Sequence, residues 1–493
     1  MDRGVTGSIA AWVEQLDYTD IPPAVREAAA MQRASVLGAV LAGARSEVAV
    51  RVREAAVDWG SGEDSTVFPG GPRAPLHSAC YANAVASVAF DFDDYLVAGH
   101  TGHSAVLAPL AFGEMLGASG RDVVTAQVAA NEVAGRLGAA FLLGPHNGQM
   151  WTYIHAIAGA VVAGRFLKLD AGRLADAIGI ALAQPPYPLA PAFFGPDSKA
   201  TLASGPLVEG IRAAQLAARG LTGAPDPISG AGGMLERIAT RGLPFAFEAL
   251  GSAWVTQSLA FKIYPGCAYI DTPVDAACVI RDEFARAKGR SLTPADVDSV
   301  RVEATLFTDG MEQMSAPHRT DSELRAADVN FSVGLSLGVL IACGEISVET
   351  LSTTSLAQNQ DEIRAVAQRV HVEQSMEMNG ALGGLNEIGI DMLRLFDPAY
   401  QPTLEGVDFG KFRMRFPSRV TLKTASRDEF VAEVATPRGA PGRPVEETRA
   451  LVAEKFLAGA RPVLRDPDAA LETVLGLDDA SNVRTAVESF RTP

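Results

Sequence analysis

The stretch FDFDDYLVAGHTGHSAV, residues 90–106, is the densest group of acid/base side chains in this sequence. It carries Asp91, Asp93 and Asp94, followed by His100 and His103. Carboxylates and imidazoles together can hold Mn, Fe or Zn, but this spacing matches neither an HExxH motif nor a structural metal motif. The same groups can transfer protons, because imidazole titrates near neutral pH and a carboxylate can orient it. In a purely structural interpretation, the aspartates cap a helix or bind backbone amides, and the histidines are polar neighbours.

Two lysines stand out by their sequence surroundings. Lys199, in FFGPDSKATLASG, follows a loop containing proline and glycine, and Lys262, in LAFKIYPGCAYID, is flanked by apolar and aromatic residues. An isolated lysine is usually solvent-exposed, and a lysine at a strand end can simply extend its ammonium into water. An ammonium held against apolar surface can instead bind a carboxylate or act with a perturbed pKa. If both lysines lie beside the 90–106 stretch, they disfavour a divalent cation and favour an anion, so we predict no metal.

Composition restricts the class of partner. The 493 residues suggest two or three domains, or one large domain with an insert, and 48% hydrophobic residues allow a large core. A net charge of −16 argues against a nucleic acid or anionic membrane partner, but not against a small anionic substrate. The cysteines are far apart and form no CxxC pair, so neither a zinc ribbon nor a disulfide framework is expected. They are Cys80, Cys267, Cys278 and Cys343.

No targeting segment is expected at the start of the sequence. The opening residues MDRGVTGSIAAWVEQL lack the apolar centre of a secretory signal. No uncharged apolar run reaches the roughly 18 residues that a membrane helix needs. We therefore expect a cytoplasmic protein.

The first half of the sequence has the pattern of packed helices. GASGRDVVTAQVAANEVAGRLGAAF begins with a capping box, Ser119 to Asp122, and continues with apolar residues at helical spacing. Glu132 and Arg136 are one turn apart, and we expect them to pair on the exposed side. His155 lies in a similarly apolar segment, WTYIHAIAG, where a lone histidine is more often a core residue than a catalyst. Helices this rich in small residues pack closely in an all-α domain.

The pattern changes after about residue 265. VDSVRVEATLF, KFRMRF and RVTLKTASRDEFVAEVATP alternate between apolar and polar residues, which predicts strands. Helical stretches lie between them, and VEETRALVAEKFLAGARPVL returns to a helix near the end. We predict a mainly α protein with an all-α domain formed by residues 1–265 and 441–493. The smaller α+β domain, residues 266–440, is inserted as a lid.

Several separated motifs resemble the MmgE/PrpD family, which includes 2-methylcitrate dehydratase, cis-aconitate decarboxylase and iminodisuccinate epimerase. The resemblance covers most of the sequence and implies a helical domain with an inserted α+β domain, usually in a homodimer. It also implies chemistry at a carbanion next to a carboxylate, without a metal or organic cofactor. The motifs are ANAVASVAFDFDD (82–94), GASGRDVVTAQVAANEVAGRLG (117–138), SK (198–199) with GIRAAQLAARGLTG (210–223), KIYPGCAYID (262–271) and DVNFSVGLSLGVLIACGEIS (328–347).

Some of the family's site residues are present in this sequence, and others are replaced. The first aspartate of the family's DF(D/N)D segment is Asp91 here, its two lysines are Lys199 and Lys262, and its following histidine is His103 in preference to His100. Four family positions have changed. A threonine is Tyr95, a histidine is Trp151 with His155 one turn further, a tyrosine is Leu335, and the histidine after YP is replaced near Cys267 or Asp271. Tyr95, Trp151 and Leu335 suggest a more apolar pocket, and hence a substrate with fewer carboxylates or an alkyl chain.

We therefore predict a cofactor-independent lyase, a dehydratase or decarboxylase, acting on a small polycarboxylate or related anion. The lysines would bind negative charge, His103 would be the general acid or base, and Asp91 would orient it or take a proton itself. The alternatives are an epimerase or isomerase with the same acid/base groups, and a non-catalytic binding paralogue. The predicted catalytic residues are Asp91, His103, Lys199 and Lys262, and the predicted substrate-binding residues are Asp94, Tyr95, His100, Trp151 and His155.

Overall fold

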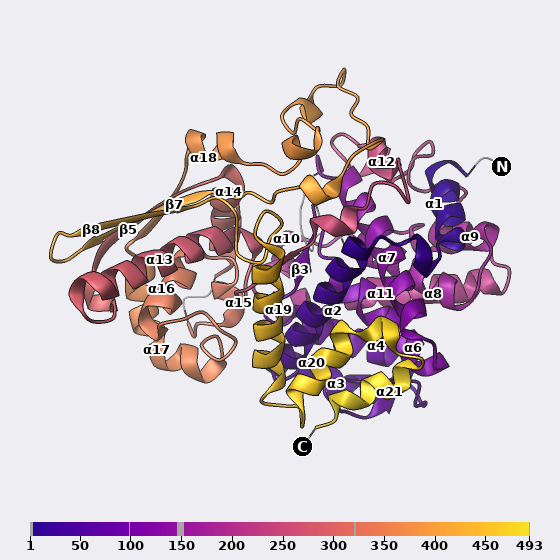
Figure 1. Cartoon of the computed structure of the whole chain (residues 1–493), viewed down its shortest axis with the longest axis horizontal. Helices are drawn as coiled ribbons and strands as arrows, with labels where there is room; N and C mark the ends of the chain where they lie inside the picture. The colour runs from indigo at the N-terminus through magenta and orange to yellow at the C-terminus, as the bar shows by residue number, and fades with distance from the viewer. Residues whose placement is uncertain (1–2, 98, 145–151, 320–321, 493) are drawn as a thin grey trace.

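The computed structural model describes residues 3–97, 99–144, 152–319 and 322–492. Figure 1 shows a large group of helices, to which the yellow C-terminal segment returns, beside an orange part that contains the long strands. This arrangement confirms the predicted mainly α class, whereas the predicted domain boundaries and the lid remain predictions. No helix among the described residues is long and apolar enough to cross a membrane.

Helices form the larger hydrophobic core, which includes residues from both ends of the chain. The helices before the strand-rich part are α1 (Gly4–Gln15), α2 (Pro23–Gly43), α3 (Glu47–Val57), α4 (Leu76–Val88), α5 (Gly102–Ala105), α6 (Leu107–Leu116), α7 (Gly120–Ala140), α8 (Tyr153–Phe166), α9 (Ala171–Ala181), α10 (Ala190–Phe193), α11 (Ser204–Ala218) and α12 (Met234–Arg237). The helices that return to them are α19 (Val445–Ala460), α20 (Pro467–Leu475) and α21 (Val483–Val487).

The return of α19 to α2 depends on glycines at their contact. A Cβ on Gly38 of α2 would lie 2.9 Å from Phe456 Cα, and a Cβ on Gly459 of α19 would lie 2.5 Å from Gly38 O. Both distances are shorter than a real Cβ contact, so these two backbones touch only because the side chains are absent. This close approach brings the C-terminal helix, and Lys455 on it, next to the centre of the helical part.

The strand-rich part is built on one four-stranded sheet with the order β6-β5-β7-β8. Its strands are β5 (Val297–Ala304), β6 (Val370–Gln374), β7 (Ser418–Thr424) and β8 (Glu429–Val434), of which only β5 and β6 are parallel. A second hydrophobic core joins this sheet to α13 (Asp271–Lys288), α15 (Ala326–Val329), α16 (Val333–Cys343) and α17 (Thr353–Ala367). Figure 1 shows α13, α16 and α17 on one side of the sheet. The other helices of this part are α14 (Leu306–Ser315) and α18 (Met376–Ala381).

Two further pairs of very short strands lie outside this sheet. β1 (Ser65–Thr66) pairs with β2 (Arg73–Ala74), and β3 (Asp94–Tyr95) pairs with β4 (Ala260–Phe261), both antiparallel. The second pair joins two segments that are far apart in the sequence, and both segments were singled out above for their chemistry.

The structure confirms several local predictions and corrects others. Helix α7 begins with the predicted capping box, in which Ser119 and Asp122 bond reciprocally. Glu132 and Arg136 pair at 3.4 Å as predicted, but both side chains are fully buried and not on an exposed side of the helix. The segment at Val255 and Thr256 packs over the pair, and its backbone N–H groups donate hydrogen bonds to Glu132. The KFRMRF segment forms no regular strand and contributes only an isolated bridge between Gly383 and Arg415.

Candidate acid/base site

The loop after α4 places three aspartates at the centre of the molecule. Asp91 has a φ of 52°, a left-handed conformation that aspartate tolerates better than most residues, and it turns the chain away from α4. β3 then pairs with β4, with Asp94 opposite Phe261, and Lys262 N donates to Asp93 O at 3.1 Å. The short strand pair therefore holds Lys262 beside the aspartates.

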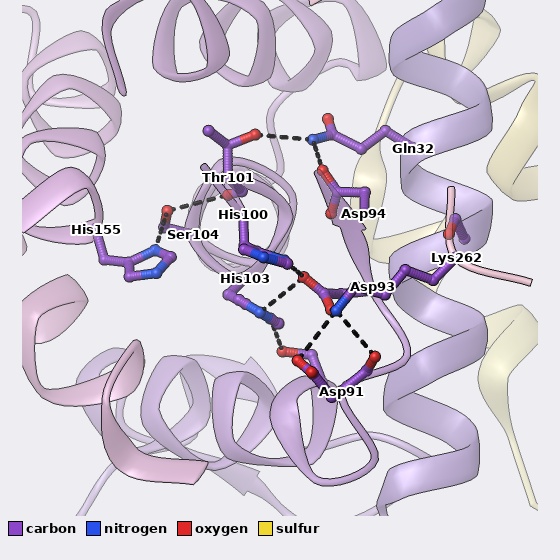
Figure 2. A network of polar contacts seen from close by, with 12 residues as sticks. Gln32, Asp91, Asp93, Asp94, His100, Thr101, His103, Ser104, His155 and Lys262 are labelled. Atoms are coloured by element: carbon purple, nitrogen blue, oxygen red, sulfur yellow. Dashed lines mark hydrogen bonds and ion pairs between the residues drawn. The ribbon is translucent and has the colours of Figure 1, made fainter. Parts of the chain in front are cut away.

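Lys262 and two of the aspartates form a buried ionic cluster (Figure 2). Lys262 Nζ lies 3.0 Å from Asp91 Oδ1 and 2.9 Å from Asp93 Oδ1, and it also donates to Asp91 O at 3.0 Å. Lys262 and Asp93 are fully buried, and Asp91 nearly so. Burial acts to lower the pKa of Lys262, but the two carboxylates outweigh it, so the pKa is raised and the lysine stays charged.

Both carboxylates stay ionised in this cluster despite their burial. Burial acts to raise the pKa of Asp91, but Lys199 and Lys262 outweigh it and lower this pKa. For Asp93 burial is outweighed by Lys262 and then by His100 and His103, which hold its pKa well below the usual range. Buried charges of this kind require paired partners, which the cluster supplies.

His100 and His103 bind the same oxygen of Asp93 from different environments. His100 Nδ1 lies 2.7 Å from Asp93 Oδ2, and its side chain is 12% exposed. His103 Nε2 lies 3.1 Å from the same oxygen, with its Nδ1 2.7 Å from Ser87 Oγ, and its side chain is fully buried. Only His100 of the two borders the cavity described below.

Lys199 completes the group at the edge of the cluster. It lies in a short 3₁₀ helix, Asp197–Thr201, and its Nζ is 3.3 Å from Asp91 Oδ1. Its ammonium also lies 5.1 Å from the ring centre of Phe331, close enough for a cation–π contact. The structure thus brings together all four predicted catalytic residues, although Lys199 and Lys262 were 63 positions apart in the sequence.

The predicted substrate-binding residues lie in three different places. Tyr95 borders the cavity together with His100. Asp94 points away into the helical core, where its Oδ2 accepts from Gln32 Nε2 at 2.8 Å, and burial followed by Asp93 raises its pKa to about 6. His155 is fully buried with Nδ1 3.0 Å from Ser104 Oγ, and burial lowers its pKa well below the usual range (Figure 2). Trp151 lies outside the described residues.

Lys455 is a part of the site that the sequence did not reveal. Its Nζ donates to Asp93 O at 3.2 Å, Lys262 O at 3.0 Å and Ser35 Oγ at 2.8 Å. It also lies 4.1 Å from the ring centre of Phe92. Burial lowers the pKa of Lys455 to about 7. Through these contacts α19 fixes both segments that carry the cluster.

A cavity opens beside the cluster, with an empty volume of about 1040 Å³ that is partly open to solvent. Asp91, Tyr95 and His100 border it, and the remaining lining is largely aromatic and aliphatic. Leu335, which the resemblance aligned with a family tyrosine, belongs to the second hydrophobic core and is not among the lining residues. A concave apolar site with a few polar groups on one wall is typical of a small-molecule site.

The same side chains offer one geometry for a metal ion. Asp93, His100 and His103 each present a ligand atom, and these atoms lie within 4.8 Å of one another. However, Lys262 Nζ is 2.9 Å from the other oxygen of Asp93, and its charge would repel a divalent cation bound there. The absence of a metal stays a prediction, which chelation can test.

Fold and site together define a mainly α protein with a histidine–aspartate pair beside an apolar cavity and two lysines behind the cavity wall. Residues 7–245 match the model of the MmgE/PrpD N-terminal domain, which confirms the predicted resemblance.

Two curated relatives carry the same name. A cis-aconitate decarboxylase of Aspergillus terreus (strain NIH 2624 / FGSC A1156) is 26% identical over 319 residues, covering 60% of this chain and 64% of the relative. Another cis-aconitate decarboxylase of Aspergillus terreus is 26% identical over 294 residues, covering 55% of this chain and 59% of the relative. The chain thus matches less than two thirds of the length of either relative.

Proposed function

We propose that the protein is a lyase that removes carbon dioxide or water from a small carboxylate by proton transfer next to the carboxylate. The observation that carries the proposal is the 2.7 Å contact between His100 Nδ1 and Asp93 Oδ2 beside the cavity. Lys199 pairs with Asp91, which also borders the cavity. The family and the two relatives named as decarboxylases support the same class of reaction.

His100 is the group that exchanges the proton with the substrate. Ionised Asp93 accepts the Nδ1 proton of His100, which fixes the tautomer and leaves Nε2 to act on a substrate in the cavity. In decarboxylation, the C–C bond to the leaving carboxylate breaks, its electron pair stays on carbon, and the imidazolium returns a proton to that carbon. In dehydration, neutral His100 first takes the proton from carbon, and the hydroxide leaves as water after receiving a proton.

The other charged groups hold this pair ready. Lys262 keeps Asp93 ionised, so Asp93 can stabilise the imidazolium. Lys199 lies at the edge of the cluster, where its ammonium can attract a substrate carboxylate and stabilise charge that develops beside it. His103, which the resemblance favours as the base, is fully buried behind Asp93, and we propose that it orients this carboxylate.

Proton NMR in D2O tests the reaction. The protein is incubated with cis-aconitate, citrate, 2-methylcitrate, malate and alkyl- or aryl-substituted mono- and diacids, with and without EDTA. A new vinyl signal, or loss of a carboxyl carbon in a parallel carbon NMR spectrum, that persists in EDTA supports a metal-independent lyase. Exchange of a proton next to the carboxylate without a new skeleton would support the isomerase alternative. No change with any compound would support a binding paralogue and contradict the proposal.

The family resemblance also leads us to propose a cytoplasmic homodimer that needs no metal or organic cofactor. Light scattering coupled to size exclusion tests the dimer, since a single mass near the 51.6 kDa of one chain would contradict it.

A further inference from the structure

The cavity beside the acid/base site is lined mainly by large apolar side chains. Polar groups enter only from a few positions, chiefly Asp91, Tyr95 and His100, at one wall. The segment 382–416 contributes apolar side chains, and further rings come from α10, α14 and the loop before α16. The apolar lining includes Phe193, Phe307, Met311, Phe331, Leu382, Leu385, Met392, Phe412, Met414 and Phe416.

Positive charge at the cavity is scarce. No lysine or arginine is among the described lining residues. The residues outside the described ranges contain no lysine or arginine either. Lys199 and Lys262 stand behind the wall, but Asp91 and Asp93 balance their charges. A ligand with three carboxylates would lose its hydration here without three cations to replace it, which is costly.

The apolar lining favours an apolar body in the ligand over further carboxylates. An apolar substituent would gain free energy from contact with the aromatic and aliphatic lining, whereas additional carboxylates would not.

We infer that the substrate is a carboxylic acid with a single carboxylate at the His100–Lys199 end and a bulky aryl or alkyl body in the apolar part. This inference rests on the proposed function and specifies its substrate class. It predicts that the cavity discriminates against tricarboxylates such as the acid in the relatives' name.

Two unreactive ligands of similar backbone length test the inference by isothermal titration calorimetry. 3-Phenylpropanoate has one carboxylate and an aryl body, and propane-1,2,3-tricarboxylate has three carboxylates and no apolar body. We expect the phenyl compound to bind at least about tenfold tighter, because only it can use the apolar lining. A tricarboxylate that binds equally well or better would overturn the inference.

Two neighbouring variants locate the binding. Phe307 borders the cavity and stacks on Tyr269 with ring centres 5.9 Å apart, whereas Leu306 on the same helix is 45% exposed and does not line the cavity. Phe307→Ala should weaken phenylpropanoate binding by roughly fivefold, and Leu306→Ala should leave it unchanged. Equal effects of both variants, or no measurable binding by wild type, would overturn the inference.

The binding assay and the NMR assay can fail separately. Binding of phenylpropanoate that depends on Phe307 supports the substrate class even if no compound reacts. In that case only the proposed reaction is contradicted. Efficient turnover of cis-aconitate alone would leave the lyase proposal standing and overturn the substrate class.

Discussion

Asp93 Oδ2 is shared by two imidazoles, and the exposure of those imidazoles separates their roles. His100 borders the cavity, while His103 is enclosed between Asp93 and Ser87. A proton can reach a substrate only from the ring that touches the cavity, so the position of His100 matters more to the chemistry than the motif that singles out His103. The distinction depends on side-chain direction, which the spacing of the two histidines does not fix.

His100→Gln should lower kcat by about 10²- to 10⁴-fold with little change in KM, because it removes the proton carrier but keeps the size of the side chain. His103→Gln is the matched variant, and we expect a smaller loss, since it acts through Asp93. Steady-state kinetics on a substrate found by NMR measures both. A larger loss of kcat in His103→Gln than in His100→Gln would show that His103 is the general base.

The two lysines should differ in what they stabilise. Lys262→Met leaves Asp93 without its buried cation and should lower the free energy of unfolding by about 3–5 kcal/mol. Lys199→Met leaves Asp91 paired with Lys262, so it should cost little stability while raising KM or lowering kcat. Urea unfolding beside kinetics separates the effects. Comparable stability in both variants would argue against the buried cluster.

At the level of elements, the short helix α5 must pass very close to Asp94. A Cβ on Gly102 would lie 1.9 Å from Asp94 Oδ1 and 2.4 Å from Val36 Cγ2, so any side chain there would push the 91–95 loop away from α2. The loop carries Asp91 and Asp93. Its position therefore depends on the absence of a side chain at Gly102.

Gly102→Ala should lower the free energy of unfolding by roughly 1–3 kcal/mol through overpacking, and should also lower kcat by shifting the loop. Gly205 in α11 is the control, since a Cβ there meets nothing within 4 Å and alanine favours the helix. Thermal unfolding of both variants checks this. A Gly102→Ala protein as stable as Gly205→Ala would contradict the packing argument.

The elements themselves were predictable to different degrees. The capping box at Ser119 and the alternation of β5, β7 and β8 lead to the observed helix and strands. The KFRMRF alternation does not, because these residues pack against the helical part and have no continuous neighbouring strand. β3 and β4 are each two residues long, too short for any periodicity, and they form because tertiary contacts bring them together.

For the whole molecule, the site is assembled from segments that the fold brings together over long distances in the sequence. Asp91, Lys199 and Lys262 could be identified because they sit in motifs with distinct composition. Lys455 could not, because it lies in an ordinary helix and its contact with Asp93 spans 362 positions. Nothing in the sequence near Lys455 indicates that it is buried. The glycines at the contact between α19 and α2 can be interpreted only once the structure shows which backbones they touch.

The ionic cluster should also shape the response of the whole molecule to acid. Asp91 and Asp93 have lowered pKa values in the fold, so they contribute stability that is present above about pH 4 and lost as the pH falls toward their folded pKa values. In Lys262→Met the main cause of the lowered pKa of Asp93 is absent, and one of the two lysines that lower the pKa of Asp91 is lost. The loss of stability below about pH 4 should therefore be shallower in this variant, as circular dichroism would measure. Parallel curves would show that Lys262 does not hold these pKa values down.

The most direct test of the central claim is solvent proton transfer measured by NMR in D2O, comparing wild type with His100→Gln on the same carboxylate. If His100 exchanges the proton next to the carboxylate, wild type incorporates deuterium into substrate or product, and the variant does so at least about 100-fold more slowly. Equal rates of deuterium incorporation in the two proteins would contradict the assignment of His100 and Asp93 as the acid/base pair.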